Sequence, residues 1–137
     1  MIRIKIAMFA AAALALPATA HAEKVTLIAT LNGASETPPA DADGTGNFSA
    51  EVDTEAGDFC YTLTAAKIDK ATMAHIHTGA AGVSGPPVIT VDVVSDECIA
   101  VEPDVLKAIV AAPEGYYVNV HNAAYPGGAI RGQLAKK

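Results

Sequence analysis

Short runs in which apolar and polar residues alternate recur along this sequence from residue 25 onward, each closed by turn residues. In the segment 59–65, Phe59, Tyr61 and Leu63 share one face of an extended chain and threonines occupy the other. Because successive side chains of a strand point to opposite faces, such a run predicts a half-buried strand. By the same criterion we predict strands at residues 25–31, 45–52, 59–65, 71–77, 88–94, 116–121 and 129–134.

One segment, residues 102–112, has helical character instead. Pro103 lies near its first turn, apolar residues recur at helical spacing, and Pro113 stops it. Many short strands, frequent turns and one short helix predict an all-β fold, an antiparallel Greek-key-like β-sandwich or small barrel. No internal repeat or linker divides residues 23–137, so we expect one domain there.

The first 22 residues have the pattern of an export signal. Arg3 and Lys5 precede an apolar run over residues 6–16, and Pro17 and the small-residue end 20–22 follow. This pattern predicts a secretory signal peptide over residues 1–22, cleaved after Ala22. A membrane-spanning helix needs about 20 apolar residues, so we expect no membrane insertion after cleavage. The expected location is periplasmic or secreted.

Charge narrows the classes of partner. Without Arg3 and Lys5, seven basic residues face fifteen acidic ones, a net charge of −8. Nucleic acids and anionic membrane surfaces are bound by positively charged faces, so we expect neither as a partner.

Two cysteines, Cys60 and Cys98, remain in a chain predicted to leave the cytoplasm. An even, minimal number in an oxidising compartment favours one structural disulfide. The alternative, a thiolate metal ligand or a redox pair, has no C-x-x-C spacing to support it.

The segment "AHIH" places His75 and His77 one residue apart in a predicted strand. Residues two apart on a strand share a face, with about 6–7 Å between their Cα atoms, so both imidazoles can converge on one ion. On a helix the same pair would point to nearly opposite sides.

The remaining histidine after residue 22, His121, ends the segment "YYVNVHN". Alternation places Tyr117, Asn119 and His121 on one face, opposite Val118 and Val120. Three neutral imidazoles on adjacent strands would suit copper, with zinc as the second choice. The alternative is structural histidines held by hydrogen bonds to the backbone.

Two charged residues, Arg131 and Glu36, are candidates for a role near such a site. Arg131 is the only arginine after residue 22, and it lies in a predicted strand. We expect a buried ion pair, with Glu36 as the candidate partner; the alternative is a guanidinium that receives a small anion near the metal. Glu36, Asp41, Asp43 and Asp58 form a solvated rim in our interpretation, because the calcium-loop pattern is incomplete.

Three segments, "LNGASETPPADADGTGNFSAEV", "MAHIHTGAAGVSGPPV" and "YYVNVHNAAYPGGAIRGQL", resemble the signatures of the CHRD domain, named from chordin. The resemblance runs from about Val25 to Leu134. It implies a secreted domain of the kind found in animal chordins, which are extracellular regulators of growth factors, and in single-domain bacterial proteins. The matching positions are Glu36, Pro38, Pro39, His75, His77, Gly79, Tyr117, Asn119, His121, Tyr125, Pro126, Gly127, Arg131 and Gly132.

The chain is also similar, more weakly, to the copper-binding sandwich of Cu/Zn superoxide dismutases. That family joins an H-x-H pair to another histidine, has one disulfide, and guides its anion with an arginine. Here the fourth copper ligand, the bridging histidine and the zinc loop are missing.

These observations together predict a CHRD-domain protein that binds copper through His75, His77 and His121. Glu36, Tyr117, Asn119 and Arg131 are the candidate neighbours of the metal or of an anion. We favour a protein without enzymatic activity; an active one would be a copper-dependent oxidoreductase of the superoxide dismutase type. The alternative function is a non-catalytic extracellular module for an unidentified protein partner.

Overall fold

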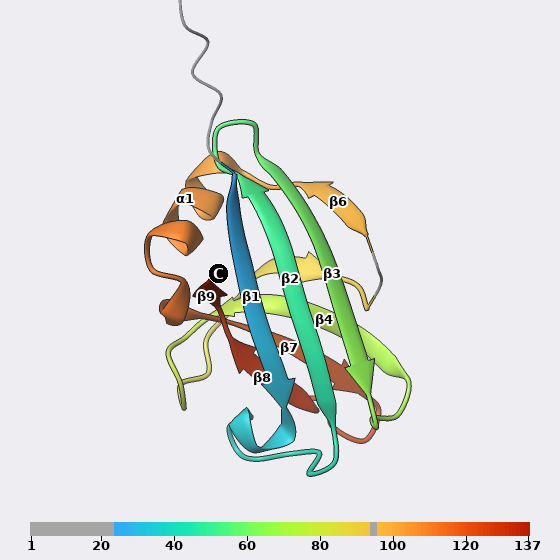
Figure 1. Ribbon diagram of the computed structural model, residues 1–137. Coiled ribbons are helices and arrows are strands. Elements are labelled where there is room, and N and C mark those ends of the chain that lie inside the picture. The colour runs from blue at the N-terminus through green and yellow to red at the C-terminus, as the bar shows by residue number, and fades with distance from the viewer. Residues whose placement is uncertain (1–23, 94–95) are drawn as a thin grey trace, which may run out of the picture.

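A computed structural model describes residues 24–93 and 96–137, whose strands form one curled antiparallel sheet (Figure 1). The expected signal peptide, residues 1–22, lies outside the described residues. The strand order is β5, β4, β7, β8, β1, β2, β3 and β6, and β9 also pairs with β1. The strands are β1 (Val25–Asn32), β2 (Thr45–Asp53), β3 (Asp58–Ala66), β4 (Ala71–Thr78), β5 (Pro87–Val91), β6 (Glu97–Ala100), β7 (Tyr116–Asn122), β8 (Ile130–Gln133) and β9 (Ala135–Lys136).

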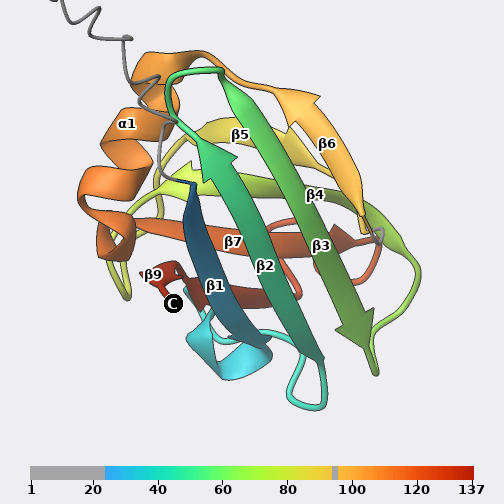
Figure 2. The ribbon, with the colours of Figure 1, turned by 45° about the horizontal axis from the view of Figure 1, so that its top comes forward.

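The curl gives the sheet two layers. β1, β2 and β3 lie in front in Figure 1, and β4, β7 and β8 cross behind them. In the turned view of Figure 2, the two terminal strands of the order, β5 and β6, are both labelled and lie above this crossing. A surface groove lined by residues of both strands, Val88–Thr90 and Ile99–Ala100, shows that the two ends of the sheet approach each other. The prediction of an all-β fold, a sandwich or small barrel with one short helix, is confirmed as this half-barrel.

The alternating runs build the core as the sequence indicates. In β2 and β3, every second residue is buried, and three aromatic rings, Phe48, Phe59 and Tyr61, pack with centroids 5.7–6.2 Å apart. The opposite layer contributes Ile76, Val118 and further apolar side chains. Apolar burial of this kind is the main stabilising contribution to folding.

Two strands and one strand end differ most from the sequence-based expectation. β6 and β9 were not expected, and β5 ends at Val91 rather than continuing to residue 94. β6 has no run of alternating buried residues; it is held by pairing with β3. β5 stops because the next backbone N–H, at Asp92, donates to the Tyr61 hydroxyl at 2.8 Å instead of continuing the ladder.

The disulfide joins these two strands. Cys60 of β3 and Cys98 of β6 are register partners, and their sulfurs are bonded, as predicted. The bridge therefore fixes an edge strand whose own sequence pattern is weak.

The α-helix α1 (Pro103–Ala111) lies at one side of the curl, and two short 3₁₀ helices, η1 (Gly33–Ser35) and η2 (Pro113–Gly115), flank other turns. Proline in its first turn fixes the start of α1, and Leu106 and Ile109 bury its apolar face.

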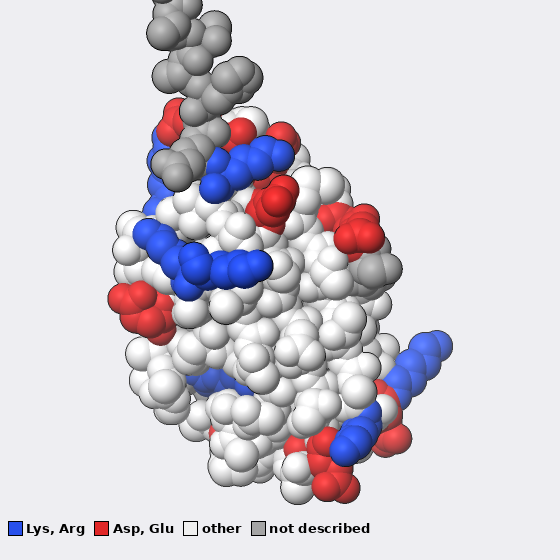
Figure 3. Space-filling view, viewed as in Figure 1, with Lys and Arg blue, Asp and Glu red and all other residues white. Residues whose placement is uncertain are grey.

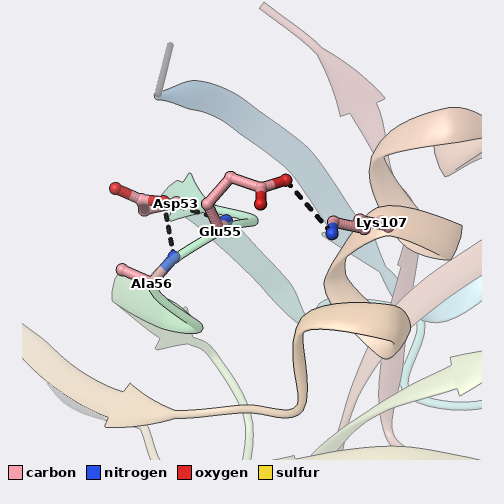
Figure 4. Close-up of polar contacts among 4 residues, drawn as sticks. All are labelled: Asp53, Glu55, Ala56 and Lys107. Atoms are coloured by element: carbon pink, nitrogen blue, oxygen red, sulfur yellow. Dashed lines mark hydrogen bonds and ion pairs between the residues drawn. The ribbon is translucent and has the colours of Figure 1, made fainter. Parts of the chain in front are cut away.

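An exposed ion pair links α1 to the turn between β2 and β3. Glu55 lies 3.1 Å from Lys107, and Asp53 accepts the backbone N–H groups of Glu55 and Ala56 (Figure 4). The hydrogen bond from Ala56 lowers the pKa of Asp53. The exposed Glu55–Lys107 pair contributes little to the stability of the fold, about 0–1 kcal/mol.

On the face shown in Figure 3, acidic and basic side chains lie near one another and mostly toward the outline. Within residues 24–93 and 96–137, no helix is both long enough and apolar enough to cross a membrane.

Candidate metal centre

The pairing of β4 with β7 sets the positions of the three histidines. His75 is the register partner of Asn119, and His77 is the register partner of Tyr117. The alternate residues of both strands, such as Ile76 and Val118, are buried in the core. The histidine face is therefore the opposite face of these two strands, as the alternation predicts.

The three imidazoles lie together. One nitrogen from each of His75, His77 and His121 falls within 4.8 Å of the others. His75 Nδ1 and His121 Nε2 are 3.2 Å apart, which matches two neighbouring ligands of a tetrahedral ion with metal–nitrogen distances of about 2.0–2.1 Å. Two ligand atoms of one tetrahedral ion are about 3.4 Å apart. Closing the widest separation that the cluster allows therefore takes a shift of about 1.4 Å or less.

Two backbone carbonyls fix the tautomers of His77 and His121. His77 Nδ1 lies 2.8 Å from the Gly85 oxygen, and His121 Nδ1 lies 3.0 Å from the Pro126 oxygen. A carbonyl can only accept a hydrogen bond, so each Nδ1 carries the proton and each Nε2 keeps its lone pair. Metal-binding histidines are oriented in this way by a hydrogen bond at the other ring nitrogen.

The Nε2 atom of His77 is buried and has no hydrogen-bond partner. Leaving a buried polar atom unpaired costs about 1–3 kcal/mol, so such atoms are rare without a reason. Here the unpaired lone pair belongs to a ring whose Nδ1 is already held by Gly85. It is therefore free to bind an ion within the histidine cluster.

Burial favours the neutral form of His75 and His121. Burial, and then the neighbouring His121 and His77, lower the pKa of His75. Burial also lowers the pKa of His121, against the opposing effect of its bond to the Pro126 carbonyl. Neutral imidazole is the form that binds a metal ion.

Tyr117 and Arg131 support His77 from one side. The rings of His77 and Tyr117 stack with centroids 4.9 Å apart and an angle of 7° between planes. The Arg131 guanidinium lies over the Tyr117 ring, 3.4 Å from its centroid. This three-layer stack fixes the plane of the His77 ring.

The expected ion pair between Arg131 and Glu36 is wrong as a direct contact, because no salt bridge joins these side chains. Arg131 instead donates to the Ala80 carbonyl at 2.8 Å and to the Gln133 side chain at 2.9 Å. Its side chain is 1% exposed, so it is also closed to an anion arriving from solvent. The guanidinium fork prefers the planar acceptors and the Tyr117 face that the fold supplies.

Glu36 lies beside Asn119 rather than at the histidines. Burial raises the pKa of Glu36 to about 6, against the opposing effects of Arg131, Asn119 and the Thr37 backbone. Asn119 is buried between its register partners His75 and Arg131. Glu36 and Asn119 thus connect the η1 loop to the strands of the site, and the expected solvated rim is wrong for Glu36, which is 7% exposed.

The sequence analysis missed the two carbonyl acceptors, Gly85 and Pro126. A side chain at Gly85 would collide with the Thr78 carbonyl, so glycine is what allows the approach to His77. The glycines and prolines of "SGPP" and "YPGG" were the available signal, but they do not reveal which backbone group meets which ring.

Residues 27–134 match the CHRD domain. The chain belongs to the CHRD family. Comparison with curated proteins and with solved structures gave no match. All three histidines, both cysteines and the four neighbouring residues discussed above lie within the CHRD match.

Proposed function

We propose that this CHRD domain binds one transition-metal ion, copper in preference to zinc, through His75, His77 and His121. The buried Nε2 of His77 carries the proposal, because no protein group pairs with its lone pair and it belongs to the cluster of three imidazoles. The 3.2 Å separation of His75 Nδ1 and His121 Nε2 supports it as a pair of neighbouring ligand positions.

The donor set supports copper. Three neutral imidazoles suit copper and zinc, and among divalent ions of this series copper binds most tightly to a given nitrogen site. Both cysteines are bonded to each other, so thiolate ligands do not compete for the ion.

Binding requires one proton to move. In the structure the proton between His75 and His121 belongs to His75 Nδ1, because His121 Nδ1 already donates to Pro126. His75 is partly exposed, so water can take the proton from its Nδ1 and return one to its Nε2, which leaves the Nδ1 lone pair for the ion. The other two rings need no change of tautomer.

Titration with Cu(II), followed by calorimetry and electron paramagnetic resonance, tests the proposal. We expect one equivalent to bind with nitrogen hyperfine structure, and His75→Ala/His121→Ala to weaken binding at least about 100-fold, since two of three ligands are lost. Glu114→Gln, which removes an exposed carboxylate, is the matched control and should bind as the original protein does. Unchanged affinity in the double histidine variant would sink the proposal.

The site leaves room for further chemistry. Three protein ligands leave a position on the ion for water or a small oxygen species. As a separate second part of the proposal, the site would support dismutase-type or oxidase-type turnover. The burial of Arg131 removes the anion guide that such an enzyme would use. If the copper-loaded protein turns over no faster than free copper, this second part is wrong and the proposal of metal binding still stands.

We place this function outside the cytoplasm, in the periplasm or as a secreted protein. The disulfide supports an oxidising compartment, and the pattern of residues 1–22 supports export.

The second candidate is a non-catalytic interaction module with structural histidines and an unidentified protein partner. The direct His75–His121 hydrogen bond favours it, since this contact needs no ion. A metal-free protein whose melting temperature stays constant with added Cu(II) or Zn(II) would support the module and contradict metal binding.

A further inference from the structure

We infer that Met73 supplies a thioether sulfur as a fourth ligand and so gives the site a preference for Cu(I). The inference rests on the proposed three-histidine site and names what completes it.

The register of the sheet places Met73 at the cluster. Met73 is the direct partner of His121, and it lies two residues before His75 on the same strand. Side chains of direct partners have Cβ atoms about 4.5–5.5 Å apart on one face. Met73, His75 and His121 therefore share a face, and the sulfur, two bonds beyond Cβ, can reach between the two rings.

The environment of Met73 leaves its sulfur free to move. The residue is 50% exposed, whereas its neighbours in the core, Ala74 and Ile76, are fully buried. Its side chain lines a surface hollow at this end of β4 rather than packing into the core. A long apolar side chain exposed on a strand gains little from burial, so packing does not account for methionine here.

The chemistry of the thioether gives the site its preference. Sulfur in methionine is a neutral, soft and polarisable donor that suits Cu(I). Zn(II) is borderline-soft and takes its sulfur ligands from cysteine thiolates instead. Histidines alone do not make this distinction strongly. Addition of Met73 would thus stabilise the reduced ion specifically.

The assignment of Met73 as a ligand can be tested directly, because the chain contains few other sulfur atoms. The three methionines of the sequence are Met1, Met8 and Met73, and the first two fall in the expected signal peptide. Cys60 and Cys98 are bonded to each other on β3 and β6. In residues 24–93 and 96–137, Met73 is therefore the single thioether near the histidines.

We would load the full chain with Cu(I) and record X-ray absorption at the copper edge for the original protein and for Met73→Leu. The expected result is a sulfur shell at about 2.3 Å that disappears in Met73→Leu. Cu(I) affinity, measured by competition with a chromogenic chelator, should fall at least about tenfold, with Zn(II) affinity almost unchanged. Met1 and Met8 are present in both proteins, so the difference isolates Met73.

Asp92→Asn is the matched control, because Asp92 lines the same hollow and offers an oxygen ligand instead. It should keep the sulfur shell and the Cu(I) affinity. Copper bound by nitrogen and oxygen alone in the original protein overturns the inference while leaving the three-histidine site in place. No binding of Cu(I), Cu(II) or Zn(II) to the original protein overturns the proposed function itself.

Discussion

Arg131 is a cation that the fold buries without a carboxylate in contact. Its charge is met by the Tyr117 ring, the Ala80 carbonyl and the Gln133 amide oxygen. Gln133 in turn donates to the carbonyls of Gly79, Glu114 and Tyr116, so one side chain joins the β4–β5 loop to the end of η2. A buried charge held by neutral groups depends strongly on their geometry.

Exchange of this residue should therefore be costly even when the charge is kept. Arg131→Lys loses the planar contact with Tyr117 and one arm of the fork, and we expect it to lower the free energy of unfolding by about 2–3 kcal/mol. Urea unfolding followed by circular dichroism measures this. The reverse exchange at an exposed site, Lys107→Arg, should change stability by less than about 0.5 kcal/mol. Equal stability of Arg131→Lys and the original protein would contradict the role given to the stack.

Glu36 should give the protein a measurable pH dependence. Its folded pKa of about 6 lies above the ordinary value of 4.5, so the folded state holds the proton more tightly than the unfolded state does. Stability from this group is present below pH 4.5 and is lost as the pH rises through 6, by up to about 2 kcal/mol. We expect Glu36→Gln to remove this loss, as seen in unfolding curves at pH 4–8.

His75 and His121 change the free energy of unfolding in the opposite direction. Their pKa values are lowered in the folded state, so the folded state loses stability as the pH falls below about 6.5. Both proteins contain these histidines, so their contribution cancels when the free energy of unfolding of Glu36→Gln is subtracted from that of the original protein at each pH. Glu114→Gln again serves as the control. A difference that does not vary with pH would show that Glu36 titrates normally.

Among the elements, β6 depends most on a single bond. It is four residues long, has half-buried and exposed positions only, and pairs with one strand, β3. Loop closure by the Cys60–Cys98 disulfide spans 38 residues. In the chain-entropy account, a loop of that length stabilises the fold by about 3–4 kcal/mol.

Cys60→Ser/Cys98→Ser should therefore lower the free energy of unfolding by about 3–4 kcal/mol, again measured with urea. Copper affinity at temperatures where the variant stays folded should not change, because the hydrogen bonds and the ring stack of the three histidines involve no residue of β3 or β6. A large loss of copper binding in the folded variant would place the disulfide in the metal site, contrary to the structure.

For the whole molecule, the alternation of apolar and polar residues predicted most of the strands and the histidine face. Both depend only on the two-residue repeat of side-chain direction along a strand. The buried halves of β2 and β3, the helix ended by Pro113 and the shared face of His75 and His77 are properties of neighbouring residues. β6 could not be predicted, since none of its residues is fully buried and its pairing partner lies about forty residues away.

The covering of the histidine face was equally beyond the sequence. Tyr117 and Asn119 were expected to face away from the core, and they do, yet both are buried. The chain folds loops over this second face, and the contacts of Gly85 and Pro126 with the rings arise only there. The position of Met73 on the histidine face could have been predicted, because it continues the alternation of His75 and His77.

The pairing of β4 with β7 has a consequence for when the ion can enter. His75 and His77 are neighbours along the chain, whereas His121 and its Pro126 acceptor come more than forty residues later. The three imidazoles therefore come together only after β7 has paired with β4. Under the proposed function, the ion would be taken up after folding, in the compartment where this pairing takes place.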